Sequence, residues 1–436
     1  MKPYLNVEEV ESALVGLEKK YPTLCERIKL PNATFEKRTC HVLRIGKKAG
    51  AGTREGILFL GSVHASEWGG ADICVSFAAD LVEAAATGTG LAYGGKSFTS
   101  AELKDITTSL DVYVFPCVNP DGRRYSMVNP PSTEWRKNRN PASSGGDPKG
   151  IGVDINRNYD FLWDFATKMH PDAAVASAIP MNPYFHGTAP ASEPETTNVV
   201  WMLDTHPNIR WLMDIHCHKG LVLYSWGDDD DQTDEPDMNF LNPAWDGKRG
   251  AMVGPYDEYI PAADLADAQE AAELFADALA AVRGTVYPVE SGFDLYPTSG
   301  SGDDYSYSRH FVDATKSKVL AFTLEYGLAS RKNENMFYPE PDVMQEIIRE
   351  VNAGMLALCL RARPVRFWRI FLTMPWWLWR IIVLGKRPRK GDIRPHGPLP
   401  RVVRALLAVA IPYAMFRVGK KVAASLSSLV RRLVGR

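Results

Sequence analysis

The chain has 436 residues, which is enough to bury a large hydrophobic core. Its 45% apolar and 23% charged residues are ordinary for a globular protein and argue against a disordered one. The net charge of −2 hides a split, because residues 361–436 hold 18 Lys and Arg and one acid, a net of +17. Residues 1–360 hold 32 basic and 51 acidic residues, a net of −19. Such opposite blocks predict two functional parts, 1–360 and 361–436.

The start of the chain and its cysteines bear on the compartment. Residues 1–9 lack the apolar stretch of a secretory signal. The six cysteines have neither C-x-x-C spacing nor that of a disulfide framework, so buried free thiols are expected. Together these features favour a reducing cytoplasm.

Hydrophobic spacing predicts strands that alternate with helices along residues 1–360. Helices are expected over residues 7–28, 68–86, 193–205, 265–283 and 341–360. Short apolar strands are expected near 41–45, 57–63, 111–118, 210–215, 221–225 and 318–325. This alternation predicts an α/β domain with a mixed, largely parallel sheet and helices on both of its faces.

Two of these strands lead directly into candidate metal ligands. His64 and Glu67, three residues apart, follow the strand expected at 57–63, and His216 follows the strand expected at 210–215. An imidazole nitrogen and a carboxylate oxygen from His-x-x-Glu can bind one divalent cation, although the pair alone could equally be a chance surface pair. Zinc with two His and one Glu keeps an open position for water, which is the arrangement of a hydrolytic site.

Further motifs follow in a fixed order. Arg136 lies in Glu134–Arg139, and Asn156 and Arg157 lie in Gly152–Tyr159. With these residues the chain resembles the zinc metallocarboxypeptidases of the carboxypeptidase A and B group. Other matching stretches are Asn119–Gly122, Phe185–Gly187, Ser192–Thr196, Leu223–Gly227, Tyr296–Gly300 and the strand that ends at Glu325. The resemblance runs from about Tyr4 to Leu360, so it covers the acidic part of the chain and implies a catalytic domain there.

The resemblance implies the chemistry of the site. His64, Glu67 and His216 would bind one zinc ion per chain, which polarises a substrate carbonyl and lowers the pKa of water. Glu325 matches the general acid/base of the family, although it could also be a surface carboxylate at a strand end. Arg136 matches the arginine that stabilises the negative charge of the tetrahedral intermediate. Arg139, three residues later, could be mistaken for it.

The resemblance also implies how a peptide C-terminus is bound. A planar guanidinium suits a carboxylate, so Arg157 assisted by Asn156 is expected to bind the chain end, and Tyr296 to close over the terminal residue. Asp303 lies seven residues after Tyr296, where carboxypeptidase B-like enzymes place the acid that receives Lys or Arg. A preference for those residues is therefore expected, unless Asp303 and Asp304 only brace their loop.

Several positions depart from the digestive members of the family. Ser66 and Thr133 stand where arginines are usual, and His218 replaces a tyrosine that serves the outer subsites. The preference for substrate length is therefore open, and His218 is expected to be non-catalytic. Cys217 is not expected to bind the metal, because neighbours on a strand point to opposite faces. The acid run at residues 228–237 is expected to be a solvated loop, with calcium binding or attraction of cationic peptides as alternatives.

Residues 361–436 have a different character. An apolar, tryptophan-rich stretch at 367–384 is interrupted by Arg and Pro, and it falls short of the about 20 apolar residues that span a bilayer. A polybasic linker follows, and residues 417–435 form an amphipathic helical pattern. Such a basic helical extension is expected to lie on an anionic membrane surface, which would place the protein in the cytoplasm at the inner face of the cell membrane. A groove on a partner protein is the alternative, and nucleic acid is not expected.

The function predicted from the sequence is zinc-dependent removal of single residues from peptide and protein C-termini. Within enzymes, the alternatives are a peptidase of cell-wall stem peptides or glutamylated tails, and an amide deacylase on a related scaffold. Outside enzymes, the alternative is a catalytically silent scaffold that presents the basic extension to membranes.

Overall fold

The computed structural model describes residues 4–128, 134–327 and 337–364. The predicted extension lies outside this description from residue 365 onward, and so does Thr133. Within the described ranges, the longest helices are too polar to cross a membrane. All six cysteines lie within these ranges, and each is buried and unpaired, as expected.

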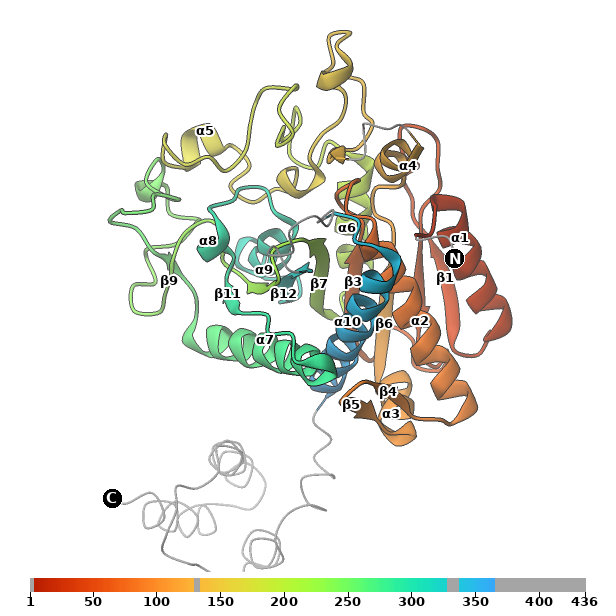
Figure 1. Cartoon of the computed structure of the whole chain (residues 1–436). Coiled ribbons are helices and arrows are strands. Elements are labelled where there is room, and N and C mark those ends of the chain that lie inside the picture. The colour runs from red at the N-terminus through yellow and green to blue at the C-terminus, as the bar shows by residue number, and fades with distance from the viewer. Residues whose placement is uncertain (1–3, 129–133, 328–336, 365–436) are drawn as a thin grey trace, which may run out of the picture. The chain divides into compact units, whose positions relative to one another are not determined.

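An eight-stranded sheet forms the centre of the described chain (Figure 1). Its order is β1-β2-β6-β3-β7-β12-β8-β11. The pairs β3–β6, β3–β7, β7–β12 and β8–β11 are parallel and the other three are antiparallel, which confirms the mixed α/β sheet. The strands are β1 Cys25–Lys29, β2 His41–Ile45, β3 Glu55–Gly61, β6 Leu110–Phe115, β7 Ile209–Cys217, β8 Leu221–Tyr224, β11 Val289–Ser291 and β12 Leu320–Tyr326.

Helices cover both faces of the sheet because successive strand residues point to opposite sides. Ile57 and Phe59 of β3 join one core cluster with residues of α2, α7 and α10, whereas Leu58 and Leu60 join another with residues of α6. Helix α9 contacts β7 and β12. The helices are α1 Val7–Lys20, α2 Gly69–Thr87, α3 Ser100–Ser109, α4 Pro120–Val128, α5 Phe165–Lys168, α6 Pro194–Thr205, α7 Ala262–Arg283, α8 Gly292–Leu295, α9 Gly302–Val312 and α10 Pro341–Ala362.

The helix expected over residues 7–28 is shorter than predicted. It ends at Lys20, and residues 25–29 instead form β1, which pairs antiparallel with β2. The cause is Pro22, because proline cannot continue a helix and disfavours the helical conformation in the residue before it. The apolar residues counted toward one long helix therefore belong to two elements.

Only part of the acid run at 228–237 is a solvated loop: residues 234–237 are exposed, whereas its first two residues are buried. Asp228 is 0% and Asp229 is 2% exposed, and the Asp229 side chain accepts the backbone N–H of Gly250 at 2.6 Å. Next to the buried residues, β9 (Asp231–Gln232) pairs with β10 (Glu258–Tyr259) of the chain that follows. Burial raises the pKa of Glu258 to about 7. Burial and the charge of Glu258 likewise raise the pKa of Asp228.

Candidate metal and catalytic site

Three neighbouring parallel strands position the candidate site at their carboxyl ends. His64 lies three residues beyond the end of β3, while His216 and Glu325 lie near the ends of β7 and β12. In the strand register, Glu325 is the partner of His216. Because parallel strands end at the same edge, residues far apart in sequence come together there.

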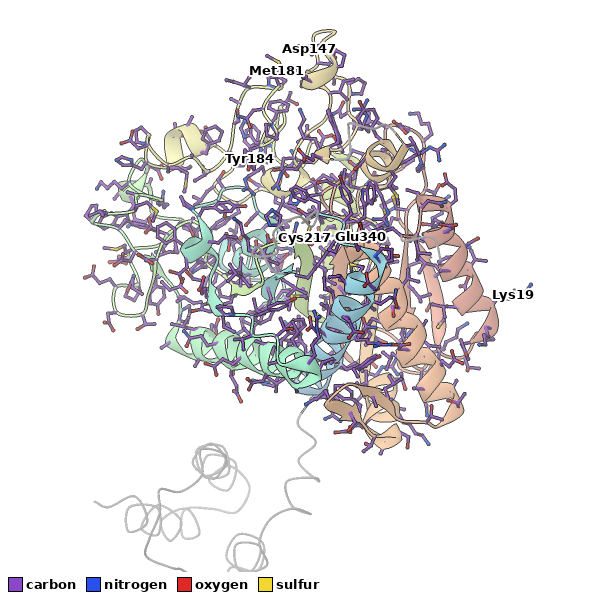
Figure 2. All side chains as sticks on the ribbon, in the orientation of Figure 1. Lys19, Asp147, Met181, Tyr184, Cys217 and Glu340 are labelled. Atoms are coloured by element: carbon purple, nitrogen blue, oxygen red, sulfur yellow. The ribbon has the colours of Figure 1, made fainter. Side chains whose placement is uncertain are left out.

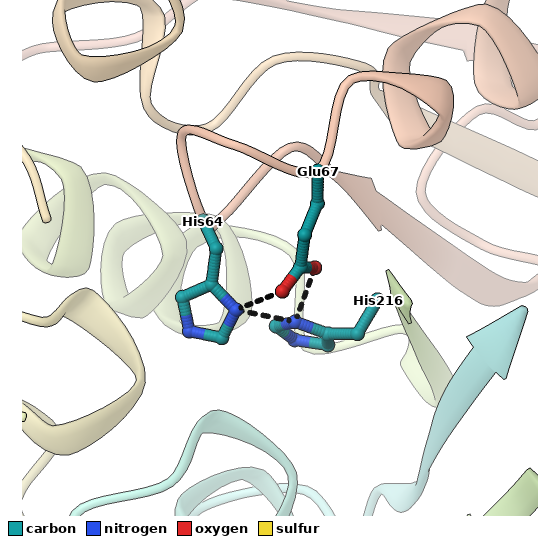
Figure 3. A group of neighbouring side chains, drawn as sticks. All are labelled: His64, Glu67 and His216. Atoms are coloured by element: carbon teal, nitrogen blue, oxygen red, sulfur yellow. Dashed lines mark hydrogen bonds and ion pairs between the residues drawn. The ribbon is translucent and has the colours of Figure 1, made fainter. Parts of the chain in front are cut away.

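His64, Glu67 and His216 bring their side chains to one point, as predicted (Figure 3). Their ligating atoms all lie within 4.8 Å of one another, and all three residues are buried. His64 Nδ1 lies 2.7 Å from Glu67 Oε1 and 2.9 Å from His216 Nδ1. His216 Nδ1 lies 3.1 Å from Glu67 Oε2. Two imidazole nitrogens thus face one carboxylate.

The other nitrogen of each imidazole lies beside a carboxylate. His64 Nε2 lies 3.2 Å from Asp154 Oδ1, and His216 Nε2 lies 2.9 Å from Asp214 Oδ2. Both are close ion-pair contacts, and neither Nε2 atom makes a hydrogen bond within the described residues. A proton held on Nε2 leaves Nδ1 as the nitrogen with a free lone pair, which is the form that binds a metal. Two such nitrogens and a carboxylate oxygen fit the ligand set of a hydrolytic zinc site.

The surroundings of Glu67 and Glu325 shift the pKa values of these two carboxyl groups in opposite directions. Burial alone would raise the pKa of Glu67, but the positive charges of His64 and His216 outweigh it and lower that pKa. Glu325 is partly exposed as a residue, yet its Oε2 atom is buried and has no hydrogen-bond partner among the described residues. Burial, and then the charge of Glu67, raise the pKa of Glu325 to about 7.

Arg136 lies beside the metal-ligand group. Its Nε donates to Asp154 Oδ2 at 2.7 Å, so the same carboxylate contacts both Arg136 and His64. The backbone carbonyl of Arg136 also accepts the N–H of Ala65, next to His64. Arg139 is directed elsewhere, because its guanidinium lies 3.7 Å from the ring centre of Tyr125. These contacts favour Arg136 over Arg139 as the arginine that would stabilise the tetrahedral intermediate.

Arg157 is buried and held firmly. Its Nε donates to the carbonyl of Val175 at 2.7 Å, and one terminal nitrogen donates to the carbonyl of Asn156. Its guanidinium carbon lies 5.8 Å from the ring centres of Tyr296 and Tyr184, the latter labelled in Figure 2. Both tyrosines are exposed, at 39% and 45%. Arg157 therefore lies beside two exposed aromatic rings.

Asn156 contributes to the same region. Its side-chain oxygen accepts the backbone N–H of Gly302 at the start of α9, at 2.8 Å. The chain passes very close to Arg157 at Gly300, where an added Cβ would lie 2.4 Å from the Arg157 carbonyl oxygen and φ is +68°. Glycine is required there, because other residues would clash and rarely adopt that φ.

Asp303 and Asp304 differ in their contacts. The Asp304 carboxylate accepts N–H of Gly227 at 3.1 Å and the hydroxyl of Ser301 at 2.9 Å, so it braces the loop. The Asp303 carboxylate accepts the hydroxyl of Thr323 at 2.8 Å, as well as the backbone N–H of Asp304. Thr323 lies two residues before Glu325 on β12, so both side chains point to the same face of the sheet. Asp303 therefore lies on the side of the sheet that carries the candidate base.

Three residues of this region were missed when roles were assigned from the sequence. Asp154 and Asp214 contact the two histidine ligands, and Tyr184 lies over Arg157 and 5.1 Å from Arg136. Asp214 had a visible signal, since it stands two residues before His216 on a strand and must share its face. Tyr184 had none, because it comes from an irregular segment.

Comparison with known proteins identifies a family whose model matches most of the chain. The family model described as zinc carboxypeptidase matches residues 10–354. Carboxypeptidase B of Astacus astacus is 27% identical over 334 residues, which cover 76% of this chain and 90% of that protein. Carboxypeptidase A4 of Mus musculus is 26% identical over 308 residues, which cover 70% of this chain and 59% of that protein. The match thus spans most of the first relative and under two thirds of the second.

Solved structures agree at the level of the fold. Carboxypeptidase A from Helicoverpa armigera has a TM-score of 0.62 at 21% identity, with 82% of this chain and 73% of that chain covered. Thrombin activatable fibrinolysis inhibitor has a TM-score of 0.60 at 20% identity, with 82% of this chain and 74% of that chain covered.

Proposed function

This chain belongs to the zinc carboxypeptidase family, and from that premise we propose that it is a zinc-dependent metallocarboxypeptidase that removes residues from the C-termini of peptides or proteins. The observation that carries this proposal is the convergence of His64, Glu67 and His216 within 4.8 Å, with Glu325 in register beside His216. A ligand set and a candidate base thus lie together at one edge of the sheet.

The residues of the site support peptide-bond hydrolysis in distinct ways. Zinc, when bound by the three ligands, supplies a Lewis acid for the scissile carbonyl. Glu325 accepts a proton from the attacking water and returns it to the departing amine, for which a pKa of about 7 is well matched. Arg136 stabilises the negative charge that develops on the carbonyl oxygen. Its contact with Asp154 fixes the guanidinium in advance of the reaction.

In this proposal, the C-terminus of the substrate is recognised by Arg157, Asn156 and Tyr296. Arg157 is held by two backbone carbonyls, so its remaining N–H groups are already oriented for a carboxylate. Tyr296 is exposed next to it and can cover a terminal residue. These residues favour carboxypeptidase activity over an amide deacylase, which needs no carboxylate clamp. The ligands and Glu325 likewise favour catalysis over a silent scaffold, while cell-wall stem peptides and glutamylated tails remain alternative substrates.

A Glu325→Gln variant tests the mechanism. An amide cannot accept the proton, so peptide hydrolysis should fall about 100- to 10,000-fold while zinc content and thermal stability stay close to wild type. Glu55→Gln is a matched control, because Glu55 is exposed at the opposite end of β3. Activity of Glu325→Gln within a few-fold of wild type would overturn the assignment of the base.

We further propose a preference for C-terminal Lys or Arg, based on Asp303. Its carboxylate is partly buried and contacts Thr323, two residues before the candidate base. A carboxylate on α9 that contacts β12 at this point can receive a cationic side chain while the terminal peptide bond faces Glu325. The net charge of −19 over residues 1–360 agrees with basic substrates.

We also propose that residues 361–436 hold the enzyme at an anionic membrane surface, at the inner face of the cell membrane. The support comes from composition alone: a net charge of +17, tryptophan beside arginine, and an amphipathic pattern at 417–435. Tryptophan and arginine favour the membrane–water interface, and basic residues favour anionic lipid.

A further inference from the structure

Asp214 is a buried carboxylate directly next to a candidate zinc ligand. It lies on β7 two residues before His216, so strand alternation places both side chains on one face. Its Oδ2 lies 2.9 Å from His216 Nε2, the nitrogen directed away from Glu67 and His64, as a close ion-pair contact and not as a hydrogen bond of favourable geometry. Asp214 is 2% exposed, so this contact is shielded from bulk water.

The contact resembles that of the other histidine, with one difference. Asp154 lies 3.2 Å from His64 Nε2, but it also accepts Arg136 Nε and the backbone N–H of Asn156. Asp214 makes its only ion pair within the described residues with His216, and its Oδ1 has no hydrogen-bond partner there. The charge of Asp214 therefore acts mainly on His216.

We propose that Asp214 is a positioning residue of the zinc site: its carboxylate, 2.9 Å from His216 Nε2, favours the tautomer that carries the proton on Nε2 and thereby leaves Nδ1, beside Glu67 and His64, free to bind the metal. The inference rests on the proposed function in that it takes zinc as the cation at this site. Together, Asp154 and Asp214 give each histidine ligand its own carboxylate.

The physical consequence is tighter binding of zinc. A carboxylate that accepts the second ring proton fixes the tautomer and orientation of the imidazole and makes its other nitrogen a stronger donor. Losing such a partner lowers metal affinity by about 10- to 100-fold. Asparagine keeps an acceptor but no charge, whereas leucine of similar size leaves the Nε2 proton without an acceptor. Asp214→Asn should therefore weaken zinc binding less than Asp214→Leu.

Zinc affinity of the full chain, measured by competition with a chromogenic chelator, tests the proposal without any peptide substrate. We expect affinity about 10-fold weaker for Asp214→Asn and about 100-fold weaker for Asp214→Leu, with Asp154→Asn also weaker. Asp111→Asn is the matched control. Asp111 is a buried carboxylate on the nearby strand β6 and forms ion pairs with Arg44 and Arg54, so that variant should lose stability but keep zinc affinity.

The zinc affinities of these variants distinguish the proposal from its alternatives. Asp214→Asn with zinc affinity within twofold of wild type, while Asp154→Asn is weakened, would overturn the proposal. Unchanged zinc affinity together with a raised KM for peptides ending in Lys or Arg would overturn it too, and would assign Asp214 to recognition of the terminal side chain. A wild-type chain that does not bind zinc would overturn the proposed function as well. If Asp111→Asn weakened zinc binding as much as Asp214→Asn, the effect of Asp214 would be a general loss of packing, and the proposal would be overturned.

Discussion

The roles that we propose for Glu67 and Glu325 differ because their neighbours differ. Two histidines keep Glu67 ionised despite its burial, whereas Glu325 has a buried oxygen without a partner and faces the charge of Glu67. A carboxylate with a lowered pKa suits a metal ligand, and one with a pKa of about 7 suits proton transfer. Opposite pKa shifts of two nearby acids are a recurrent sign of such a division of roles.

Asp303→Ala tests the side-chain preference. Removing the acid that pairs with a cationic side chain should lower kcat/KM for C-terminal Lys or Arg by roughly 30-fold or more, while Leu and Phe peptides change little. Asp172→Ala is a control, since the side chain of Asp172 is 94% exposed. A wild-type enzyme that already releases Phe or Leu faster than Lys or Arg would contradict the role given to Asp303.

The candidate zinc ligands, Glu325, Arg136 and the Asn156–Arg157 pair could be proposed from sequence because each belongs to a recognisable motif in a fixed order. The structure brings the three candidate ligands together and places Glu325 beside His216. The partners of the histidines could not be assigned in the same way. Asp154 is 90 positions from His64, and only the fold brings them to 3.2 Å.

At the scale of elements, strands β3, β7 and β12 were predictable because they are continuous apolar runs with buried faces on both sides. The first helix was predicted too long, because hydrophobic spacing was followed through Pro22. The expectation for the acid run at 228–237 was correct for residues 234–237, which are exposed, and wrong for Asp228 and Asp229, which are buried. Their burial involves contacts with residues distant in sequence, such as Gly250, which local composition does not predict.

This buried acid cluster makes a pH-dependent prediction. The pKa of Glu258 is raised to about 7, so the folded state binds more protons than the unfolded state between pH 4.5 and about 7. Stability contributed by the protonated form is therefore lost as pH rises through this window. Asp228→Asn removes one of two neighbouring buried acids and should stabilise the fold by on the order of 1 kcal/mol at pH 8.

Thermal unfolding at pH 5 and pH 8 measures this effect. The melting temperature of Asp228→Asn should exceed that of wild type at pH 8, and the gap should close toward pH 5. Asp172→Asn, at an exposed position, should follow wild type at both pH values. A variant that is less stable than wild type at pH 8 would show that the Asp228 charge is needed, as it would be in a cation-binding loop.

At the scale of the whole molecule, the opposite charges of residues 1–360 and 361–436 suggest separate tasks. Helix α10 ends at Ala362, so a chain cut after Pro364 keeps every helix and strand described. This shortened enzyme should have unchanged peptide kinetics and no affinity for vesicles. The full chain should bind vesicles of anionic lipid, at about 1 kcal/mol for each basic residue near the surface.

High salt should weaken vesicle binding without abolishing it, because apolar and tryptophan side chains would remain at the interface. Vesicles of neutral lipid are the control for charge. A full-length protein that stays entirely soluble and does not bind anionic vesicles would contradict the membrane proposal, and would favour a protein partner for the extension. That result would leave the catalytic account intact.

The most direct test of the catalytic account is the release of free amino acids from a set of peptides that differ in the C-terminal residue. The purified full chain should release the last residue one at a time, stop after treatment with a chelator, and recover when zinc is added. Peptides with an amidated C-terminus should be poor substrates, because they lack the carboxylate assigned to Arg157. No release from any free-acid peptide by zinc-loaded protein, or release that persists after complete removal of zinc, would contradict the account.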